Sequence, residues 1–179
     1  VSITAPTGTD TSDTTPLLDY DIVELNLNSV VVTLDSGSGF QPISTRDLEE
    51  LASLSEGNYT LAVVVTDDAG NSGSDFVTFT IDTTPPLAPN VGTAGTTPSP
   101  TASNSPTWYW TSTDGNGTFR YSLDGDPDTG PWSAETISTD FTALGITHGV
   151  HTLYVQERDD ASNWSLSGFY PINVDLLAP

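Results

Sequence analysis

Short runs of β-branched and aromatic residues recur along the chain, and Gly, Asp, Asn or Pro residues bound them. Such runs occupy residues 59–66, 76–81, 108–111, 119–123 and 151–155. Most of them alternate between apolar and polar positions, which is typical of strands with one buried face. The pattern therefore predicts an all-β fold built from short antiparallel strands.

One segment, residues 45–54, has a helical spacing instead. Leu48, Leu51 and Leu54 are each three positions apart, which places them close to one face of a helix. The segment is long enough for only about two turns. We expect a short helix there.

A sequence repeat divides the chain into two modules. The sequence GNYTL at residues 57–61 aligns with GVHTL at residues 149–153, and DDAGN at 67–71 aligns with DDASN at 159–163, both at an offset of 92 residues. Between the modules, residues 85–89 (PPLAP) predict a short stiff linker, because proline fixes the φ angle. We expect module 1 to span residues 1–84 and module 2 to span residues 90–179.

Charge narrows the range of partners. The chain has 24 acidic and three basic residues, a net charge of −21, and no cysteine. This charge repels phosphate backbones and anionic membrane surfaces, so we expect no nucleic-acid partner and no insertion into a membrane. No apolar run approaches the roughly 20 residues of a membrane span. The chain begins with Val1 rather than Met, and we expect it to be a segment of a longer protein.

The repeated pattern G-x-Y/H-T-L-x-V-x-x-x-D-D-A-G/S-N is followed by a strand and by residues like I/V-D-T-T-P-P. It resembles the bacterial Ig-like repeats that serve as extenders in giant secreted, calcium-dependent adhesins. The resemblance covers the C-terminal half of each module. It implies an Ig-like antiparallel β-sandwich of about seven strands for each module, with calcium bound at the joints between repeats. Module 1 departs from the pattern at residues 19–24 and 47–54, and module 2 departs at Ser162 and in holding all four tryptophans.

The Ig-like topology places the candidate metal ligands. With strand F at 58–66 and 150–158, and strand G following each, the two acidic loops are F–G loops at the end where the chain enters each module. At the joint, the candidate calcium ligands are Asp82, Asp114, Asn116, Asp159, Asp160 and Asn163. At the start of module 1 they are Asp67, Asp68 and Asn71.

Two interpretations of these acidic loops stay open. Two carboxylates about 5 Å apart repel by about 3 kcal/mol at an effective dielectric constant of about 20, and the chain has no lysine to offset them. Calcium, which takes about six to eight oxygen ligands, would neutralise such a cluster. Alternatively, Asp and Asn act there only as turn formers.

The aromatic residues of module 2 allow two roles. Trp132 and Trp164 lie in or near predicted loops, where flat rings either hold sugars or cover the open ends of a sandwich. Trp108 and Trp110 share one face of strand B, and we expect one of them to be the buried tryptophan of the sandwich.

The sequence contains no signature of catalysis. His148 and His151 are the only histidines, and we expect them to be packed or surface residues of a strand. No nucleophile elbow and no Gly-rich phosphate loop frames a possible triad. We therefore expect no enzyme.

These observations favour a structural role. We expect two tandem Ig-like sandwiches in a secreted or surface-attached bacterial adhesin, monomeric and in contact with neighbouring repeats. Calcium would stiffen the joints, and the chain would project a ligand-binding tip for cell adhesion or biofilm formation. The alternative is that module 2 is itself a carbohydrate- or peptide-binding module, in an adhesin or in a secreted hydrolase.

Overall fold

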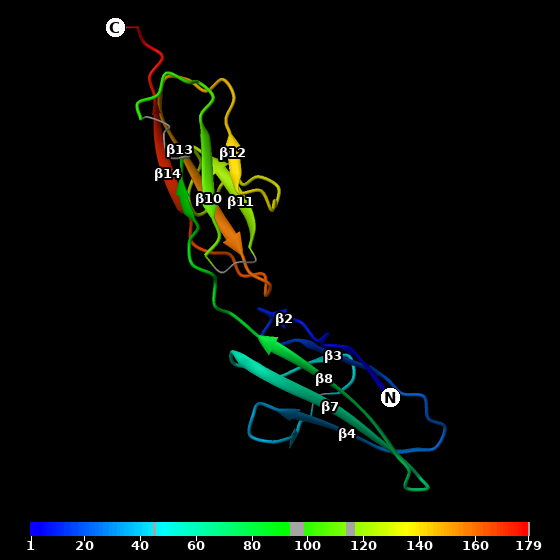
Figure 1. The fold of residues 1–179 in the computed structure, drawn as a ribbon. Coiled ribbons are helices and arrows are strands. Elements are labelled where there is room, and N and C mark those ends of the chain that lie inside the picture. Colours follow the sequence, from blue (N-terminus) through cyan, green and yellow to red (C-terminus); the bar gives the residue numbers. More distant parts are fainter. Residues whose placement is uncertain (45, 94–98, 114–116, 179) are drawn as a thin grey trace. The chain divides into compact units, whose positions relative to one another are not determined.

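The computed structural model describes residues 1–44, 46–93, 99–113 and 117–178. The chain divides into two compact units, Val1–Thr83 and Thr84–Pro179, and all regular structure in the described ranges is β-strand (Figure 1). None of these residues forms a helix long and apolar enough to cross a membrane. The all-β prediction is confirmed.

Unit 1 is built from two sheets. The first has the order β1-β3-β6, with strands β1 (Ser2–Ala5), β3 (Leu17–Asp21) and β6 (Glu49–Glu50). The second has the order β2-β8-β7-β4-β5, with strands β2 (Asp10–Thr11), β8 (Ser72–Ile81), β7 (Gly57–Asp67), β4 (Leu27–Asp35) and β5 (Gln41–Pro42). All pairs are antiparallel except β2 with β8, which run parallel.

The core of unit 1 follows from strand alternation. Along β7, every second side chain is buried: Tyr59, Leu61, Val63 and Val65. These side chains meet buried residues of the other strands, among them Leu18 of β3. The apolar and polar alternation of residues 59–66 thus gives a strand with one buried face.

The prediction of a helix over residues 45–54 is wrong for residues 46–54, which the structure describes. Residues 49–50 form β6, and Leu48 has a φ angle of 60°, which is outside the helical region. The amide of Leu51 donates to the carbonyl oxygen of Pro16, and that of Leu54 to Thr14. These bonds to a distant segment replace the local bonds that a helix would make.

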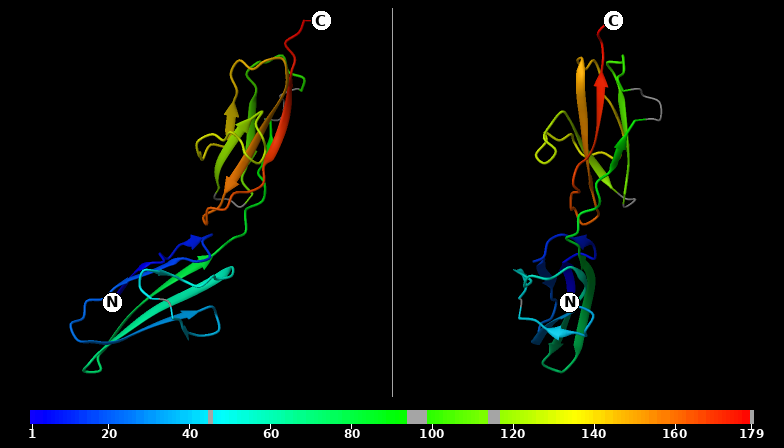
Figure 2. Two further views of the ribbon diagram at one scale, coloured as in Figure 1. Left: turned by 180° about the vertical axis from the view of Figure 1, so that it is seen from behind. Right: turned by 90° about the vertical axis from the view of Figure 1, so that its left-hand side faces the viewer.

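Unit 2 also has two sheets. The first has the order β12-β10-β9, with strands β12 (Asp140–Thr142), β10 (Thr107–Thr111) and β9 (Asn90–Gly92). The second has the order β11-β13-β14, with strands β11 (Thr118–Leu123), β13 (Gly149–Arg158) and β14 (Gly168–Val174). Figure 2 shows the strands of each unit from two further directions. The strands expected as F and G in both modules correspond to β7 and β8 and to β13 and β14.

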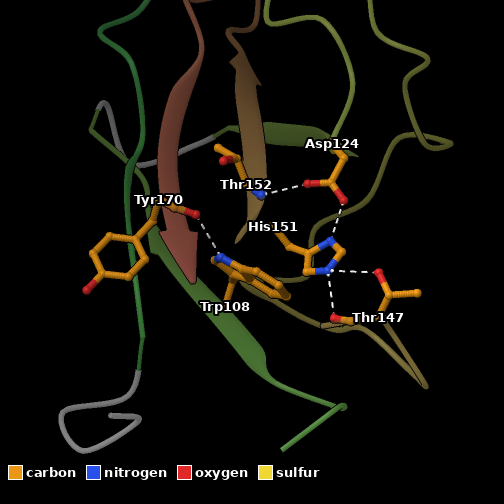
Figure 3. A network of polar contacts seen from close by, with 6 residues as sticks. All are labelled: Trp108, Asp124, Thr147, His151, Thr152 and Tyr170. Atoms are coloured by element: carbon orange, nitrogen blue, oxygen red, sulfur yellow. Dashed lines mark hydrogen bonds and ion pairs between the residues drawn. The ribbon is translucent and has the colours of Figure 1, made fainter. Parts of the chain in front are cut away.

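Two tryptophans lie in the core of unit 2, where the sequence predicted one. Trp108 is 0% exposed and Trp110 is 3% exposed. The indole N–H of Trp108 donates to the backbone carbonyl of Tyr170 over 2.9 Å, which joins the two sheets (Figure 3). Trp110 packs against the ring of Phe119 instead, with ring centroids 6.0 Å apart.

Candidate functional site

The loop between β7 and β8 is closed by Asp67, the last residue of β7, and by Asn71, the last residue before β8. The Asp67 carboxylate oxygen Oδ1 accepts hydrogen bonds from the amides of Ala69 and Asn71, at 2.9 and 2.8 Å. Its other oxygen accepts a bond from the side-chain amide of Asn71 at 2.7 Å. The bond from the Asn71 side chain is the main reason why the pKa of Asp67 lies below its ordinary value. Both carboxylate oxygens thus hold the turn.

The loop between β13 and β14 has the same construction. The backbone amide of Asn163 donates to Asp159 Oδ1 at 2.8 Å, and its side-chain amide donates to Asp159 Oδ2 at 3.0 Å. Ser162, at the position of Gly70, adopts a φ angle of 74°, close to the 88° of that glycine. The left-handed conformation is therefore kept although the sequence departs from glycine there.

The remaining candidate ligands do not complete a cation site within one unit. Asp68 and Asp160, the second acidic residue of each loop, are exposed. Asp82 follows β8 in unit 1, where its amide donates to the carbonyl oxygen of Thr11 at 2.9 Å.

Asp114 and Asn116 lie outside the described residues. In the part of the chain that the structure describes, no three acidic or histidine side chains are grouped so that they could hold a metal ion. One loop by itself therefore supplies fewer oxygens than the about six that calcium requires.

A further acidic stretch, Asp124, Asp126 and Asp128, was not among the predicted metal ligands, although its acids occupy alternate positions. Asp126 accepts hydrogen bonds from the amides of Asp128 and Thr129, at 2.9 and 2.8 Å. The pKa of Asp126 lies below its ordinary value, and the largest cause is the hydrogen bond from the Asp128 amide, followed by that from the Thr129 amide. Asp124 turns instead toward Thr152 and His151. The three carboxylates thus serve separate turns and contacts.

Arg120 occupies the space between Trp132 and Trp164. Its guanidinium carbon lies 4.7 Å from the ring centroid of Trp132 and 4.1 Å from that of Trp164. Two of its nitrogens donate to the side-chain oxygen of Gln156 at 2.9 and 2.6 Å. The guanidinium carbon of Arg158 also lies near the Trp164 ring, 5.7 Å from its centroid. A face of each ring is therefore engaged by an arginine rather than left open.

Glu157 is a buried acid that the sequence analysis missed. Its side chain is 0% exposed. The hydroxyl of Ser112 donates to its Oε1 at 2.5 Å, and the amide of Thr113 donates to its Oε2 at 3.2 Å. Alternation along β13 could have revealed it, because Glu157 follows the buried Leu153 and Val155 on the same face. The carboxylate fixes the beginning of the loop that leaves β10.

Comparisons with known proteins agree with this architecture. Residues 4–83 match the family model described as bacterial Ig-like domain. No curated protein sequence matches the chain. The fibronectin(III)-like modules of Clostridium thermocellum CbhA are similar in structure, with a TM-score of 0.52, 16% identity, and coverage of 97% of this chain and 93% of theirs.

Two further solved structures are similar. The FN1–FN3 domains of chicken CNTN1 give a TM-score of 0.51 at 11% identity, over 97% of this chain and 67% of theirs. A 1.5-MDa bacterial ice-binding adhesin gives a TM-score of 0.45 at 18% identity, over 90% of this chain and 56% of that one. The chain thus has the fold of Ig-like and fibronectin-like β-sandwiches, and residues 4–83 are similar to the bacterial Ig-like domain.

Proposed function

We propose that this chain is a spacer segment of an extracellular bacterial adhesin, which holds a ligand-binding part away from the cell surface. The observation that carries the proposal is the tandem repeat. Two sandwiches repeat the same acidic turn, closed by Asp67 and Asn71 in one unit and by Asp159 and Asn163 in the other. A repeat of this kind suits a chain of similar units, and the bacterial Ig-like match of residues 4–83 supports it.

The polar contacts of unit 2 support a structural role. Glu157 is bonded to Ser112 and Thr113, and Arg120 is bonded to Gln156 between two rings. These groups, which could otherwise serve binding or catalysis, are engaged in holding loops to strands. For the same reason we do not favour a carbohydrate-binding role for Trp132 and Trp164, because Arg120 lies on both.

We propose further that calcium stiffens the joints between repeats. Residues 1–83 carry 14 acidic side chains and one arginine, and residues 84–179 carry 10 acidic side chains and two arginines. Because both units are negatively charged, they repel each other, and a divalent cation bound at a joint would offset this repulsion. The proposed ligands are Asp82, Asp159, Asp160 and Asn163, with Asp114 and Asn116. Asp67, Asp68 and Asn71 would serve the preceding joint in the same way.

Small-angle scattering of the whole chain tests the spacer. Each sandwich is about 40 Å long, since about ten strand residues rise roughly 3.3 Å each and loops add to the ends. Two sandwiches placed end to end would span about 80 Å, so a spacer in calcium should give an elongated particle with a maximum dimension near that length. Chelation should broaden the distribution of inter-unit angles. A compact particle of roughly 55 Å, below that end-to-end length, would contradict the proposal.

Glycan and peptide arrays provide the second test. The spacer should bind neither. Binding that is lost in Trp132→Ala or Trp164→Ala, while both variants remain folded, would instead establish unit 2 as a binding module.

A further inference from the structure

A tyrosine fixes the connection that precedes β7 in unit 1. The hydroxyl of Tyr59 donates to the backbone carbonyl of Ser55, four residues earlier, at 2.9 Å. The ring is 7% exposed and stacks on Phe79. This arrangement corresponds to the tyrosine corner of Ig-like sandwiches, in which a phenol ties the chain before strand F to the strand itself.

The equivalent connection in unit 2 is held by a histidine. His151 stands 92 positions after Tyr59, and its Nε2 lies 3.0 Å from the carbonyl oxygen of Thr147, again four residues earlier (Figure 3). Two backbone bonds in each unit confirm that the connections match. Ala143 and Ile146 donate to residues near the start of β10, as Leu51 and Leu54 donate to residues near the start of β3.

The histidine makes a second contact that the tyrosine lacks. Its Nδ1 lies 2.6 Å from the Asp124 carboxylate oxygen Oδ2, and the other carboxylate oxygen accepts the amide of Thr152 at 2.7 Å. The amide of Asp124 donates in turn to the carbonyl of Thr152 at 2.8 Å. Through Asp124, the ring thus joins the connection before β13 to the end of β11.

Both ring nitrogens of His151 therefore face an oxygen acceptor. A neutral imidazole carries one N–H and can satisfy only one of them, whereas the imidazolium carries two. The hydrogen bond to Asp124 is the main cause that raises the pKa of His151 above its ordinary value; burial opposes it, and the Thr147 carbonyl and the Asp124 charge add to it. The side chain of His151 is 13% exposed.

Other titratable groups lie close by in sequence. His148 Nδ1 lies 3.4 Å from the Asp175 carboxylate, just beyond β14. The amide of Leu176 also donates to His148 Nδ1, at 3.3 Å. Both of these side chains are about half exposed, at 46% and 49%. Asp124 is the acid that contacts His151 itself.

We propose that the corner formed by Thr147, His151 and Asp124 makes unit 2 sensitive to pH near neutrality. The protonated ring fastens the connection before β13 to the end of β11, and loss of the proton leaves either the Asp124 carboxylate or the Thr147 carbonyl without its N–H donor. The corner of unit 1 has no imidazole, and the hydroxyl of Tyr59 donates its single proton to the Ser55 carbonyl. The two corners thus differ: the corner of unit 2 is built on an imidazole, and that of unit 1 is built on a phenol.

The sign of the effect follows from the raised pKa. The contribution of His151 to stability is fully present below its unfolded-state pKa of about 6.5. It is lost as the pH rises through the higher pKa of the folded state. Acidification therefore tightens this corner and alkalinisation loosens it.

The test uses the whole chain and reads both histidine rings by NMR between pH 5 and pH 9. We expect the titration midpoint of His151 to be shifted above the ordinary value, and amide exchange at residues 147–152, corrected for its intrinsic pH dependence, to accelerate across that midpoint. Amides around Tyr59 should show no such change. A midpoint at or below the ordinary value, or corrected exchange that does not respond, would overturn the proposal.

Two variants separate the corner from its surroundings. His151→Tyr transfers the unit 1 corner into unit 2, and the pH dependence of exchange should be lost. His148→Gln is the matched control, and it should keep that dependence. Retention of the same dependence in His151→Tyr would show that another group is responsible. The ring titration of the unmodified chain decides the question even if His151→Tyr does not fold.

Discussion

The guanidinium carbon of Arg120 lies 4.1 Å from the centre of the Trp164 ring, so a cation covers an aromatic face that a sugar would otherwise use. Trp132 covers the same guanidinium at 4.7 Å. The contact joins β11 to two loops that are far apart in sequence. We therefore expect these two tryptophans to stabilise unit 2 rather than to bind a ligand.

Trp164→Ala should lower the free energy of unfolding of unit 2 by about 2 kcal/mol, because apolar contact and a cation–π interaction are lost together. Urea denaturation measures this change. Tyr109→Ala is the control, since Tyr109 is 43% exposed, and a surface substitution should cost about 0.5 kcal/mol or less. Equal effects of both variants would contradict the packing role of Trp164.

Glu157→Ala should lower the free energy of unfolding of unit 2 by about 2–3 kcal/mol, because the Ser112 hydroxyl and the Thr113 amide lose their buried acceptor. Glu157→Gln should cost less, since it keeps one acceptor oxygen. The matched control is Glu135→Gln. Glu135 pairs with Arg158 at the surface over 3.2 Å, and such pairs contribute about 1 kcal/mol or less. A Glu157→Ala variant as stable as Glu135→Gln would show that the loop after β10 does not depend on this carboxylate.

Asp159→Ala should lower the melting temperature of unit 2 in metal-free buffer, because it removes the acceptor of both Asn163 bonds. Asp160→Ala should leave it unchanged, since that side chain is exposed. In unit 1, Asp67→Ala and Asp68→Ala form the corresponding pair. Calorimetry under chelation measures all four variants. If the two acids of a loop behaved alike, the first would not be the residue that closes the turn.

Calcium should raise the melting temperature of the chain by several degrees. A site with a dissociation constant of about 0.1 mM would stabilise the fold by roughly 2.7 kcal/mol at about 10 mM calcium. Sodium chloride of equal ionic strength is the control for general screening. Asp160→Ala should weaken the calcium response without changing metal-free stability. Melting that is the same in chelator and in calcium would rule out the calcium proposal.

Unit 1 should lose stability at low pH partly through Asp75. Its carboxylate accepts bonds from the amides of Ile3 and Phe76, at 2.8 and 2.9 Å, and these bonds, that from Ile3 first, lower its pKa. The contribution is present above the ordinary pKa and is lost as the pH falls through the lowered one. Asp75→Asn should flatten the decline in stability between about pH 4 and pH 2, where carboxylates titrate. Asp21→Asn, at an exposed position, should not; equal flattening in both would refute the role of Asp75.

The sequence predicted the strands with the strongest alternation and the loops between them. The repeat at residues 67–71 and 159–163 placed both acidic turns between the correct strands. The helix prediction failed at residues 48–54. The spacing of leucines does not report the bonds from Leu51 to Pro16 and from Leu54 to Thr14. These bonds depend on a segment more than thirty positions away.

The side-chain contacts of unit 2 were harder to predict for the same reason. Arg120 meets Trp132 and Trp164 only because a strand and two loops come together. Glu157, by contrast, was within reach of the alternation along β13. The local sequence pattern therefore predicted strands and turns, but it could not predict which side chains far apart in sequence contact each other.

The parallel pairing of β2 with β8 has a mechanical consequence. Asp10 and Thr11 lie beside Thr80 and Ile81, close to the point where the chain leaves unit 1. Thr101 and Val174 form the corresponding parallel bridge in unit 2. When the ends of a unit are pulled apart, two such strands slide along each other, and the bonds between them are strained together rather than opened one after another. In each unit, the segment through which tension would leave is therefore fastened in shear to an earlier segment of the same unit.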